Sequence, residues 1–462
     1  MTVDSTTEGT SAIDRTRVAE LTEREMARLS ERTPKSKERY ERGLKVMPGG
    51  VPSSFQMNEP WPVFLERGQG ARVWDVDGHE YVDFHNGFGV MAVGHANPTI
   101  GDAVKARIDL GTHFAAPTDG SIIVAEELVD RFGLPQWRFT NSGTESTMDA
   151  VHLARGVTGR DLILKIEGSY HGHHDAVMVS VYPPLEALGE RDDPRSVPYG
   201  AGYPLALTEL TRAVPFNDAV ALESVLNKLE GQVAGLIMEP AMMNINIIPP
   251  VDGYLERVRE LCSAHGVQLI FDEVKTGATV ARGGATERFG VTPDMITLAK
   301  AICGGYPGGA IGMTDELGAA VADNTVVQYG TFNGNPMVMA AAESTLTEVL
   351  TPEAYKKLED ANGWLLGRCD EIIEQYGLPC YTQGLGAKGC VVFSNEPMRE
   401  YRDYLTMVDG DLSTLAWLYH MNHGVFMTPG VEEEWTISVA HTEEDLQTFA
   451  DALEAFARDV TA

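Results

Sequence analysis

The pattern of hydrophobic and polar positions changes near residue 94. Before this point, residues 71–84 alternate between apolar and polar side chains around Asp77-Gly78, a pattern that predicts a β-hairpin. From residue 94 to residue 335, apolar runs at 234–238, 267–271 and 310–313 alternate with helical stretches such as 122–132 and 254–264. Because strands of a parallel sheet are buried on both faces and joined by helices, this alternation predicts an α/β fold with a mainly parallel central sheet.

The two ends of the chain have other patterns. Residues 1–35 are polar and charged, which predicts a flexible N-terminal arm. A short helix capped by Ser36 is expected to follow. Beyond Pro336 a long helical stretch is predicted, and Thr442 with Asp445 resembles a capping box before a final amphipathic helix. The predicted organisation is an arm at 1–35, a large central domain at 94–335, and two flanking sections at 36–93 and 336–462.

Composition and charge narrow the class of protein. Hydrophobic residues make up 43% of the 462 residues and charged residues 22%, which indicates a folded globular chain. With 36 Lys and Arg against 67 Asp and Glu, the net charge of −31 argues against nucleic acids and anionic membranes as partners. Five cysteines without a C-x-x-C pair, and no apolar run of about 18 residues, predict a cytoplasmic protein with reduced thiols.

A turn that could hold a phosphate is the first candidate site. Ser142, Gly143 and Thr144 lie between the short stretch 137–139 and a helical pattern at 147–155. Backbone N–H groups and hydroxyls at a helix N-terminus, together with the positive end of the helix dipole, suit a phosphate. Serine and threonine also cap helices routinely, so this turn alone leaves phosphate binding and simple capping open.

An acid and a lysine are the next candidates. Asp272 follows the apolar run 267–271, and ligands bind at the carboxyl ends of strands in parallel sheets. On its own, Asp272 is compatible with a metal ligand, a general base or a helix cap. Lys300 lies in an apolar run before Gly304-Gly305. Desolvation lowers the pKa of such a lysine and suits it to form a Schiff base, whereas a surface lysine with a buried stem is the alternative.

Together these residues match the needs of pyridoxal 5′-phosphate. This cofactor requires a phosphate anchor, a carboxylate at its pyridine nitrogen and an amine for its aldehyde. Tyr170, shortly after the apolar run 162–166, adds an aromatic ring to stack on the cofactor. The histidines of His171–Asp175 leave metal binding as an alternative, but no second ligand cluster accompanies them. The sequence therefore predicts pyridoxal 5′-phosphate as the cofactor and no metal.

At this point the chain resembles a known family. It is similar to the class III pyridoxal-phosphate aminotransferases of fold type I, and within them to glutamate-1-semialdehyde aminomutase and its relatives, from about Arg39 to Ala457. The resemblance implies a large cofactor-binding domain, a smaller α+β domain built from both chain ends, and a homodimer. The motifs that carry it are Asn141-Ser142-Gly143-Thr144-Glu145, Tyr170-His171-Gly172-His173, Glu239-Pro240, Phe271-Asp272-Glu273-Val274, the segment around Lys300, and Gly330-Thr331-Phe332-Asn333-Gly334-Asn335-Pro336.

The resemblance also implies a role for each matching residue. Lys300 would form the internal aldimine and move the proton at the substrate carbon, and Asp272 would pair with the pyridine nitrogen. Tyr170 and Val274 would enclose the two faces of the ring. The remaining cofactor-binding residues would be Ser142, Gly143 and Thr144 at the phosphate, Thr331 at the phosphate of the neighbouring subunit's cofactor, Asn244 at the phenolic oxygen, and Glu239.

Three positions depart from the family pattern and are candidates for substrate binding. Gln56 replaces the arginine with which the aminomutase holds its substrate carboxylate, so a bidentate clamp is lost. Phe88 replaces the glutamine that follows the Asp-Phe strand in dialkylglycine decarboxylase. Glu433 belongs to an acidic run that would favour a neutral or cationic amine if it faced the cleft, and that is otherwise a solvated loop.

These departures favour transfer of an amino group between two molecules over its transfer within one molecule. The sequence predicts an aminotransferase that moves an amino group from an amine or amino acid to a keto or aldehyde acceptor by a ping-pong mechanism. The alternative is a glutamate-1-semialdehyde-type 2,1-aminomutase or an amino acid racemase on the same fold. A cofactor-binding protein without activity is a third hypothesis, which no motif supports.

Overall fold

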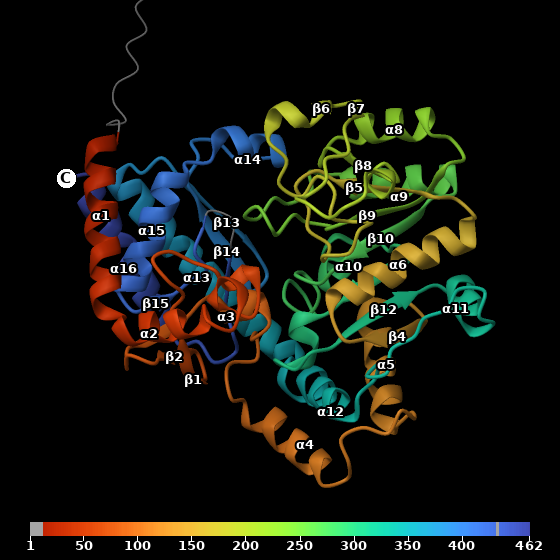
Figure 1. Cartoon of the computed structure of the whole chain (residues 1–462), viewed down its shortest axis with the longest axis horizontal. Helices are drawn as coiled ribbons and strands as arrows, with labels where there is room; N and C mark the ends of the chain where they lie inside the picture. The colour runs from red at the N-terminus through yellow and green to blue at the C-terminus, as the bar shows by residue number, and fades with distance from the viewer. Residues whose placement is uncertain (1–12, 431–433) are drawn as a thin grey trace, which may run out of the picture.

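A seven-stranded sheet forms the centre of the larger part of the protein, in a computed structural model that describes residues 13–430 and 434–462 (Figure 1). Only β12 runs antiparallel to its neighbours β4 and β11, and the other described pairs are parallel, which confirms the α/β prediction. In order across the sheet the strands are β4 (Gln136–Thr140), β12 (Gly309–Met313), β11 (Met295–Leu298), β10 (Gln268–Asp272), β9 (Val233–Met238), β5 (Leu162–Ile166) and β8 (Thr211–Val214).

Helices cover both faces of this sheet. Alternate residues of β5, β9 and β10 pack on opposite sides: Ile163, Ile237 and Ile270 join the core under α6 and α11, whereas Leu164, Leu236 and Leu269 join the core under α8 and α9. The helices of this larger part are α4 (Pro98–Ile108), α5 (Asp119–Phe132), α6 (Gly143–Thr158), α7 (Leu205–Thr208), α8 (Ala219–Lys228), α9 (Tyr254–His265), α10 (Gly284–Phe289), α11 (Asp315–Ala322) and α12 (Pro336–Ser344), and a short hairpin is formed by β6 (Gly189–Glu190) and β7 (Asp193–Pro194).

Both ends of the chain build the smaller α+β part, on the left in Figure 1. Its first sheet has the order β1-β2-β3-β15, in which β2 and β3 form the predicted hairpin and β15 pairs parallel with β3. The strands are β1 (Leu65–Gln69), β2 (Arg72–Asp75), β3 (Glu80–Asp83) and β15 (Val425–Phe426), and a second sheet holds β13 (Tyr381–Leu385), β14 (Lys388–Val392) and β16 (Trp435–Thr436). The helices are α1 (Arg15–Arg32), α2 (Pro34–Gly43), α3 (Asn86–Gly89), α13 (Pro352–Tyr376), α14 (Tyr401–Met407), α15 (Gly410–Asn422) and α16 (Glu443–Val460).

The predicted flexible arm is wrong over residues 15–32, which form α1. Asp14 caps this helix by accepting a hydrogen bond from the Thr16 N–H, and α1 packs along α15. Its apolar residues are few, but Val18, Leu21 and Leu29 lie on one buried stripe. A helix needs only such a stripe when a neighbouring helix covers it, and composition alone does not reveal the neighbour.

The start of α2 also differs from the prediction. It begins at Pro34, with Thr33 rather than Ser36 at its cap position. Ser36 is buried instead: its hydroxyl donates to Asp77 and accepts from the Phe64 N–H. The hydroxyl therefore joins α2 to the hairpin turn at Asp77.

The helical stretch after Pro336 is two helices. A π-turn at Thr345–Val349 separates α12 from α13, and Thr351 caps α13 just before Pro352. Helix α12 packs against α4 and α5, so the larger part extends beyond the predicted boundary at residue 335. The capping box of Thr442 and Asp445 is present as predicted. Among the helices of the described ranges, none has the length and apolar character needed to cross a membrane.

Candidate active site

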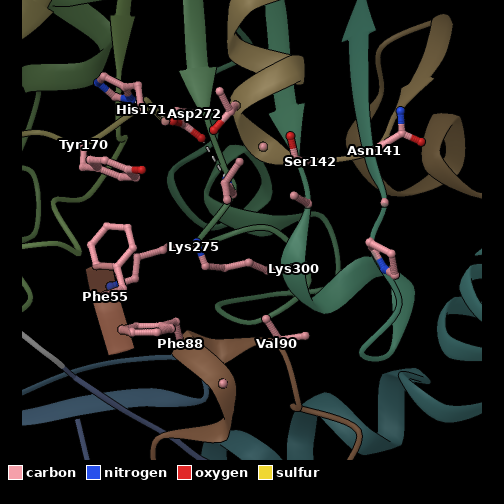
Figure 2. A pocket seen from close by; sticks show the side chains of 18 of the residues that line it. Phe55, Phe88, Val90, Asn141, Ser142, Tyr170, His171, Asp272, Lys275 and Lys300 are labelled. Atoms are coloured by element: carbon pink, nitrogen blue, oxygen red, sulfur yellow. Dashed lines mark hydrogen bonds and ion pairs between the residues drawn. The ribbon is translucent and has the colours of Figure 1, made fainter. Parts of the chain in front are cut away.

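The carboxyl edge of the central sheet gathers the predicted cofactor residues other than Thr331. Ligands of open parallel sheets bind at this edge because the loops leaving the strands meet there. Figure 2 shows several of these side chains facing one cavity of about 450 Å³. Each residue follows a different strand: Ser142 after β4, Tyr170 after β5, Glu239 after β9, Asp272 at the end of β10 and Lys300 after β11.

The predicted phosphate turn opens helix α6. The Ser142 side chain caps this 16-residue helix by accepting from the Glu145 N–H at 3.2 Å, which leaves its own hydroxyl proton available for an acceptor. A Cβ on Gly143 would lie 3.0 Å from a methyl of Val274, so glycine permits the close approach of these two segments. Ser142, Gly143 and Thr144 line the cavity at the positive end of the helix dipole, an arrangement that fits a phosphate.

Asp272 lines the cavity with a fixed orientation. One carboxylate oxygen accepts from His171 Nδ1 at 2.7 Å, and the other accepts from the Thr297 hydroxyl at 3.1 Å and the Val274 N–H at 3.0 Å. Asp272 and His171 are both buried. A buried carboxylate that accepts from three donors keeps its direction, as a partner for a protonated ring nitrogen must.

His171 is therefore a site residue that the sequence placed only as a potential metal ligand. Its Nε2 is buried without a hydrogen-bond partner among the described residues. Within those residues, no cluster of three or more histidine, cysteine, aspartate or glutamate side chains has the arrangement of a metal site. The hydrogen bond to Asp272 assigns His171 to the support of the carboxylate.

Lys300 has a strained backbone. Its φ of 50° lies in the left-handed region, which costs a non-glycine residue about 1–3 kcal/mol. The turn that follows, Lys300–Cys303, ends at Gly304, where a Cβ would overlap the Thr345 hydroxyl. Strain held in place by surrounding packing is typical of functional positions, and here it places the Lys300 side chain in the cavity (Figure 2).

Tyr170 and Val274 both line the cavity, as their predicted places beside the cofactor ring require. Burial raises the pKa of Tyr170 to about 12, so its phenol stays neutral at physiological pH. The Tyr170 ring meets Phe55 edge-on, with 5.5 Å between ring centroids. The ring of Tyr170 thus has a fixed aromatic neighbour on the side of the N-terminal section.

Glu239 and Asn244 form the wall beside Tyr170. The Glu239 carboxylate accepts from the Met243 N–H at 2.8 Å and from the Tyr170 N–H at 3.3 Å. Burial raises the pKa of Glu239. Asn244 lines the cavity and accepts from the Tyr182 hydroxyl through its carbonyl. Glu239 therefore supports the Tyr170 loop, and the contact of Asn244 with a phenolic oxygen stays a prediction.

The structure places the predicted substrate-binding residues differently relative to the cavity. Phe88 lines the cavity and approaches Phe55, with 5.8 Å between ring centroids. Gln56 is exposed on the turn Ser54–Gln56 and does not line the cavity, whereas its neighbour Phe55 does. Glu433 lies outside the described residues. Thr331 is exposed and lines a separate hollow, so its predicted role across a subunit interface stays a prediction.

The described lining of the cavity lacks the arginine that typically binds a substrate carboxylate. Among the described residues that line it, none is arginine, and Phe55, Phe88 and Tyr170 form one aromatic side (Figure 2). Arg282, which follows β10 in the sequence, does not line the cavity and pairs with Glu127 and Asp130. This side of the cavity is therefore aromatic, and Lys275 is a further residue of the lining.

A buried ion network adjoins the cavity and was not predicted. Glu434 accepts from Lys388 Nζ at 2.8 Å and from Lys275 Nζ at 3.2 Å. Lys275 lines the cavity and also donates to the Met243 carbonyl. Burial alone would raise the pKa of Glu434, but the two lysines outweigh it and lower that pKa. The carboxylate therefore holds a cavity-lining lysine to strand β14.

We expect Glu434→Gln to destabilise the fold. The substitution removes a buried negative charge that Lys388 and Lys275 both contact, and breaking a buried ion pair costs about 3–5 kcal/mol in the free energy of unfolding. Because the folded-state pKa of Glu434 is lowered, its contribution is present above the ordinary glutamate pKa of about 4 and is lost as pH falls further. Urea denaturation at several pH values measures both effects.

Glu359→Gln is the matched control. Glu359 pairs with Arg288 at the surface, and breaking this pair should cost about 0–1 kcal/mol. Equal unfolding midpoints for the two variants would contradict a stabilising role for Glu434.

Comparison with known proteins identifies the family. The class III aminotransferase model matches residues 54–453. A glutamate-1-semialdehyde 2,1-aminomutase 2 from Bacillus licheniformis is 38% identical over 427 residues, which cover 91% of this chain and 96% of that protein.

Solved structures agree with this result. A glutamate-1-semialdehyde aminomutase from Pseudomonas aeruginosa PAO1 has a TM-score of 0.89 at 30% identity, covering 97% of this chain and 100% of that one, and it has also been solved as a variant in complex with PMP. An omega-transaminase from Sphaerobacter thermophilus has a TM-score of 0.88 at 32% identity, covering 92% and 98%. The chain belongs to the class III aminotransferase family.

Proposed function

We propose that the protein is a pyridoxal-phosphate enzyme that transfers amino groups. The observation that carries the proposal is the presence of Asp272, Lys300 and the N-terminus of α6 in one cavity. When bound, the cofactor supplies an electron sink for the substrate carbon that carries the amine. A similar aminomutase holds PMP in its solved structure, which supports this choice of cofactor.

The residues of the cavity divide the work. Ser142, Gly143 and Thr144 would hold the phosphate, and Asp272, supported by His171, would keep the ring nitrogen protonated. Tyr170 and Val274 would keep water from the two ring faces.

Lys300 has two tasks in this proposal. Its amine would carry the cofactor between turnovers. When a substrate amine has replaced Lys300 on the cofactor, the freed Lys300 amine would accept the proton from the substrate carbon. It would then donate that proton to another atom of the substrate or cofactor.

The comparisons favour transfer within one carbon skeleton. Several curated relatives at 36–38% identity are named glutamate-1-semialdehyde 2,1-aminomutases. They support the aminomutase alternative better than the transfer between two molecules that the sequence favoured. An aminomutase-type reaction is therefore the first candidate.

The cavity itself favours a second candidate. Gln56 stands at the position of the aminomutase arginine, arginine is absent from the described lining, and Phe55 and Phe88 face the substrate side. A clamp for a carboxylate chain is thus replaced by aromatic surface. Transfer from an apolar amine to a separate carbonyl acceptor fits this lining, and an omega-transaminase is among the similar structures.

One experiment separates the two reactions. The enzyme is incubated either with glutamate 1-semialdehyde alone or with 1-phenylethylamine and pyruvate, and products are identified by mass spectrometry. We expect one arm to turn over: an isomer formed without an acceptor supports the first candidate, and alanine with acetophenone supports the second. If the enzyme binds no pyridoxal phosphate, the proposal fails as a whole.

A homodimer belongs to the same proposal. Thr331 lies on an exposed segment beside Phe332, and the hollow that it lines includes Phe114 and Ile122, which are also exposed. An apolar, hollowed surface suits a second copy of the chain. The predicted cytoplasmic location, and the expected absence of nucleic-acid and membrane partners, stay predictions.

A further inference from the structure

Helix α14 connects the C-terminal section with the larger part, close to the loop 167–183 that carries Tyr170. The contacts come from three consecutive residues at its start, Glu400, Tyr401 and Arg402. In Figure 1, α14 lies between the two halves of the molecule. Its residues Tyr401 and Tyr404 belong to the core of the larger part. Glu400, which precedes α14, pairs with Arg191 of the larger part. The beginning of α14 is therefore anchored on the larger part.

Arg402 holds Glu167 with two parallel hydrogen bonds. Its Nε donates to one carboxylate oxygen at 2.9 Å and its Nη2 to the other at 2.8 Å. The Glu167 side chain is 1% exposed and that of Arg402 is 16% exposed, so solvent screens this pair little. Paired bonds of this kind fix orientation as well as distance. Glu167 is the first residue after β5 and lies three residues before Tyr170.

Tyr401 contacts the same loop at two further residues, Gly168 and Pro183. Its hydroxyl donates to the Pro183 carbonyl at 2.9 Å. Its ring lies so close to Gly168 that a Cβ there would overlap it, and Gly168 has a φ of 75°. The backbone of the loop therefore packs closely against α14 at Gly168 and is hydrogen-bonded to it at Pro183.

Lys165 supports the loop from the inside. Its fully buried Nζ donates to the Ser169 carbonyl at 2.9 Å and to the Val179 carbonyl at 2.8 Å. These bonds close the base of the loop within the larger part. Glu239 holds the Tyr170 N–H on the cavity side. The contacts from α14 hold the loop from outside, at Glu167, Gly168 and Pro183.

We propose that Arg402 is a positioning residue for Tyr170, acting through Glu167. The proposal rests on the proposed function in one respect, namely that Tyr170 covers the cofactor ring. Arg402 itself is not among the residues that line the cavity. Through the paired bonds, the C-terminal section sets how well the larger part holds its cofactor.

The test compares Arg402→Gln with the double variant Glu167→Gln/Arg402→Gln. We expect Arg402→Gln to weaken the affinity for pyridoxal phosphate by about tenfold, as loss of a supporting residue behind a ligand typically does. The circular dichroism of the bound cofactor should fall at saturating cofactor, and hydrogen exchange of residues 167–183 should rise in the cofactor-free protein. The double variant, which removes both members of the Arg402–Glu167 ion pair, should fold and keep the weakened affinity.

Arg282→Gln is the matched control. Arg282 also pairs with acids, donating from Nη2 to Glu127 and Asp130, and it does not line the cavity, so its loss should leave cofactor affinity and dichroism unchanged. Arg402→Lys should recover part of the affinity. Wild-type values in Arg402→Gln, or full recovery in the double variant, would overturn the positioning role. Failure of the wild type to bind pyridoxal phosphate would instead overturn the proposed function.

Discussion

Lys300→Ala should lower turnover by at least about 10⁴-fold, the upper range for loss of a general acid–base, because it also removes the amine that holds the cofactor. The cofactor should then be lost on dialysis, whereas the wild type retains it. Reduction with borohydride, digestion and mass spectrometry locate the attachment: in the wild type, the added mass should lie on the peptide that contains residue 300.

A second lysine in the cavity provides a control for the assignment of Lys300 as the residue that binds the cofactor covalently. Lys275 also lines the cavity, so a second lysine lies within the same space. Cofactor mass on the peptide that contains residue 275, or turnover of Lys300→Ala near that of wild type, would refute the assignment. Lys105→Ala, a surface variant, should match the wild type in both measurements.

Asp272→Asn should slow the half-reaction with an amino donor by about 10²–10⁴-fold at saturating cofactor, the range for loss of a positioned proton-holding group. Asparagine keeps the shape of the side chain but carries no charge, so the cofactor ring nitrogen would lose its proton. His171 would also lose the carboxylate that its Nδ1 contacts. Stopped-flow absorbance of the cofactor measures the rate directly.

Thr297→Val calibrates the result for Asp272. It removes one hydrogen bond to the carboxylate and keeps the charge, so we expect a loss of tenfold at most, about 1–1.4 kcal/mol. A rate for Asp272→Asn that matches the rate for Thr297→Val would mean that the charge of Asp272 is not what the reaction requires.

The sequence predicts the central sheet and its cofactor residues because both depend on local patterns. Strands buried on both faces are continuous apolar runs, as in β9, and the residue that follows such a run lies at the edge where ligands bind. Asp272 ends the buried strand β10, whose apolar run is readable from the order of residues, whereas the short strand β11 before Lys300 was not predicted. The family resemblance then supplied their chemical roles.

The residues that were missed depend on contacts between distant segments. Phe55, rather than Gln56, lines the cavity because a 3-10 turn directs it there. Glu434 was read as part of an acidic loop, yet its partners Lys275 and Lys388 lie on two other elements. Helix α1 was read as a flexible arm because its covering partner α15 lies almost 400 residues later. Composition and spacing carry no information on such pairings.

The wall that carries Phe88 has an implication for biosynthesis. Asn86, two residues before Phe88, donates to the Thr436 carbonyl at 2.7 Å across 350 positions of the chain. On the ribosome, the strands from residue 136 to residue 313 emerge well before Thr436, and domains form as their residues become available. The wall that carries Phe88 can therefore close only after almost the whole chain has been synthesised, later than the strands that carry the cofactor residues.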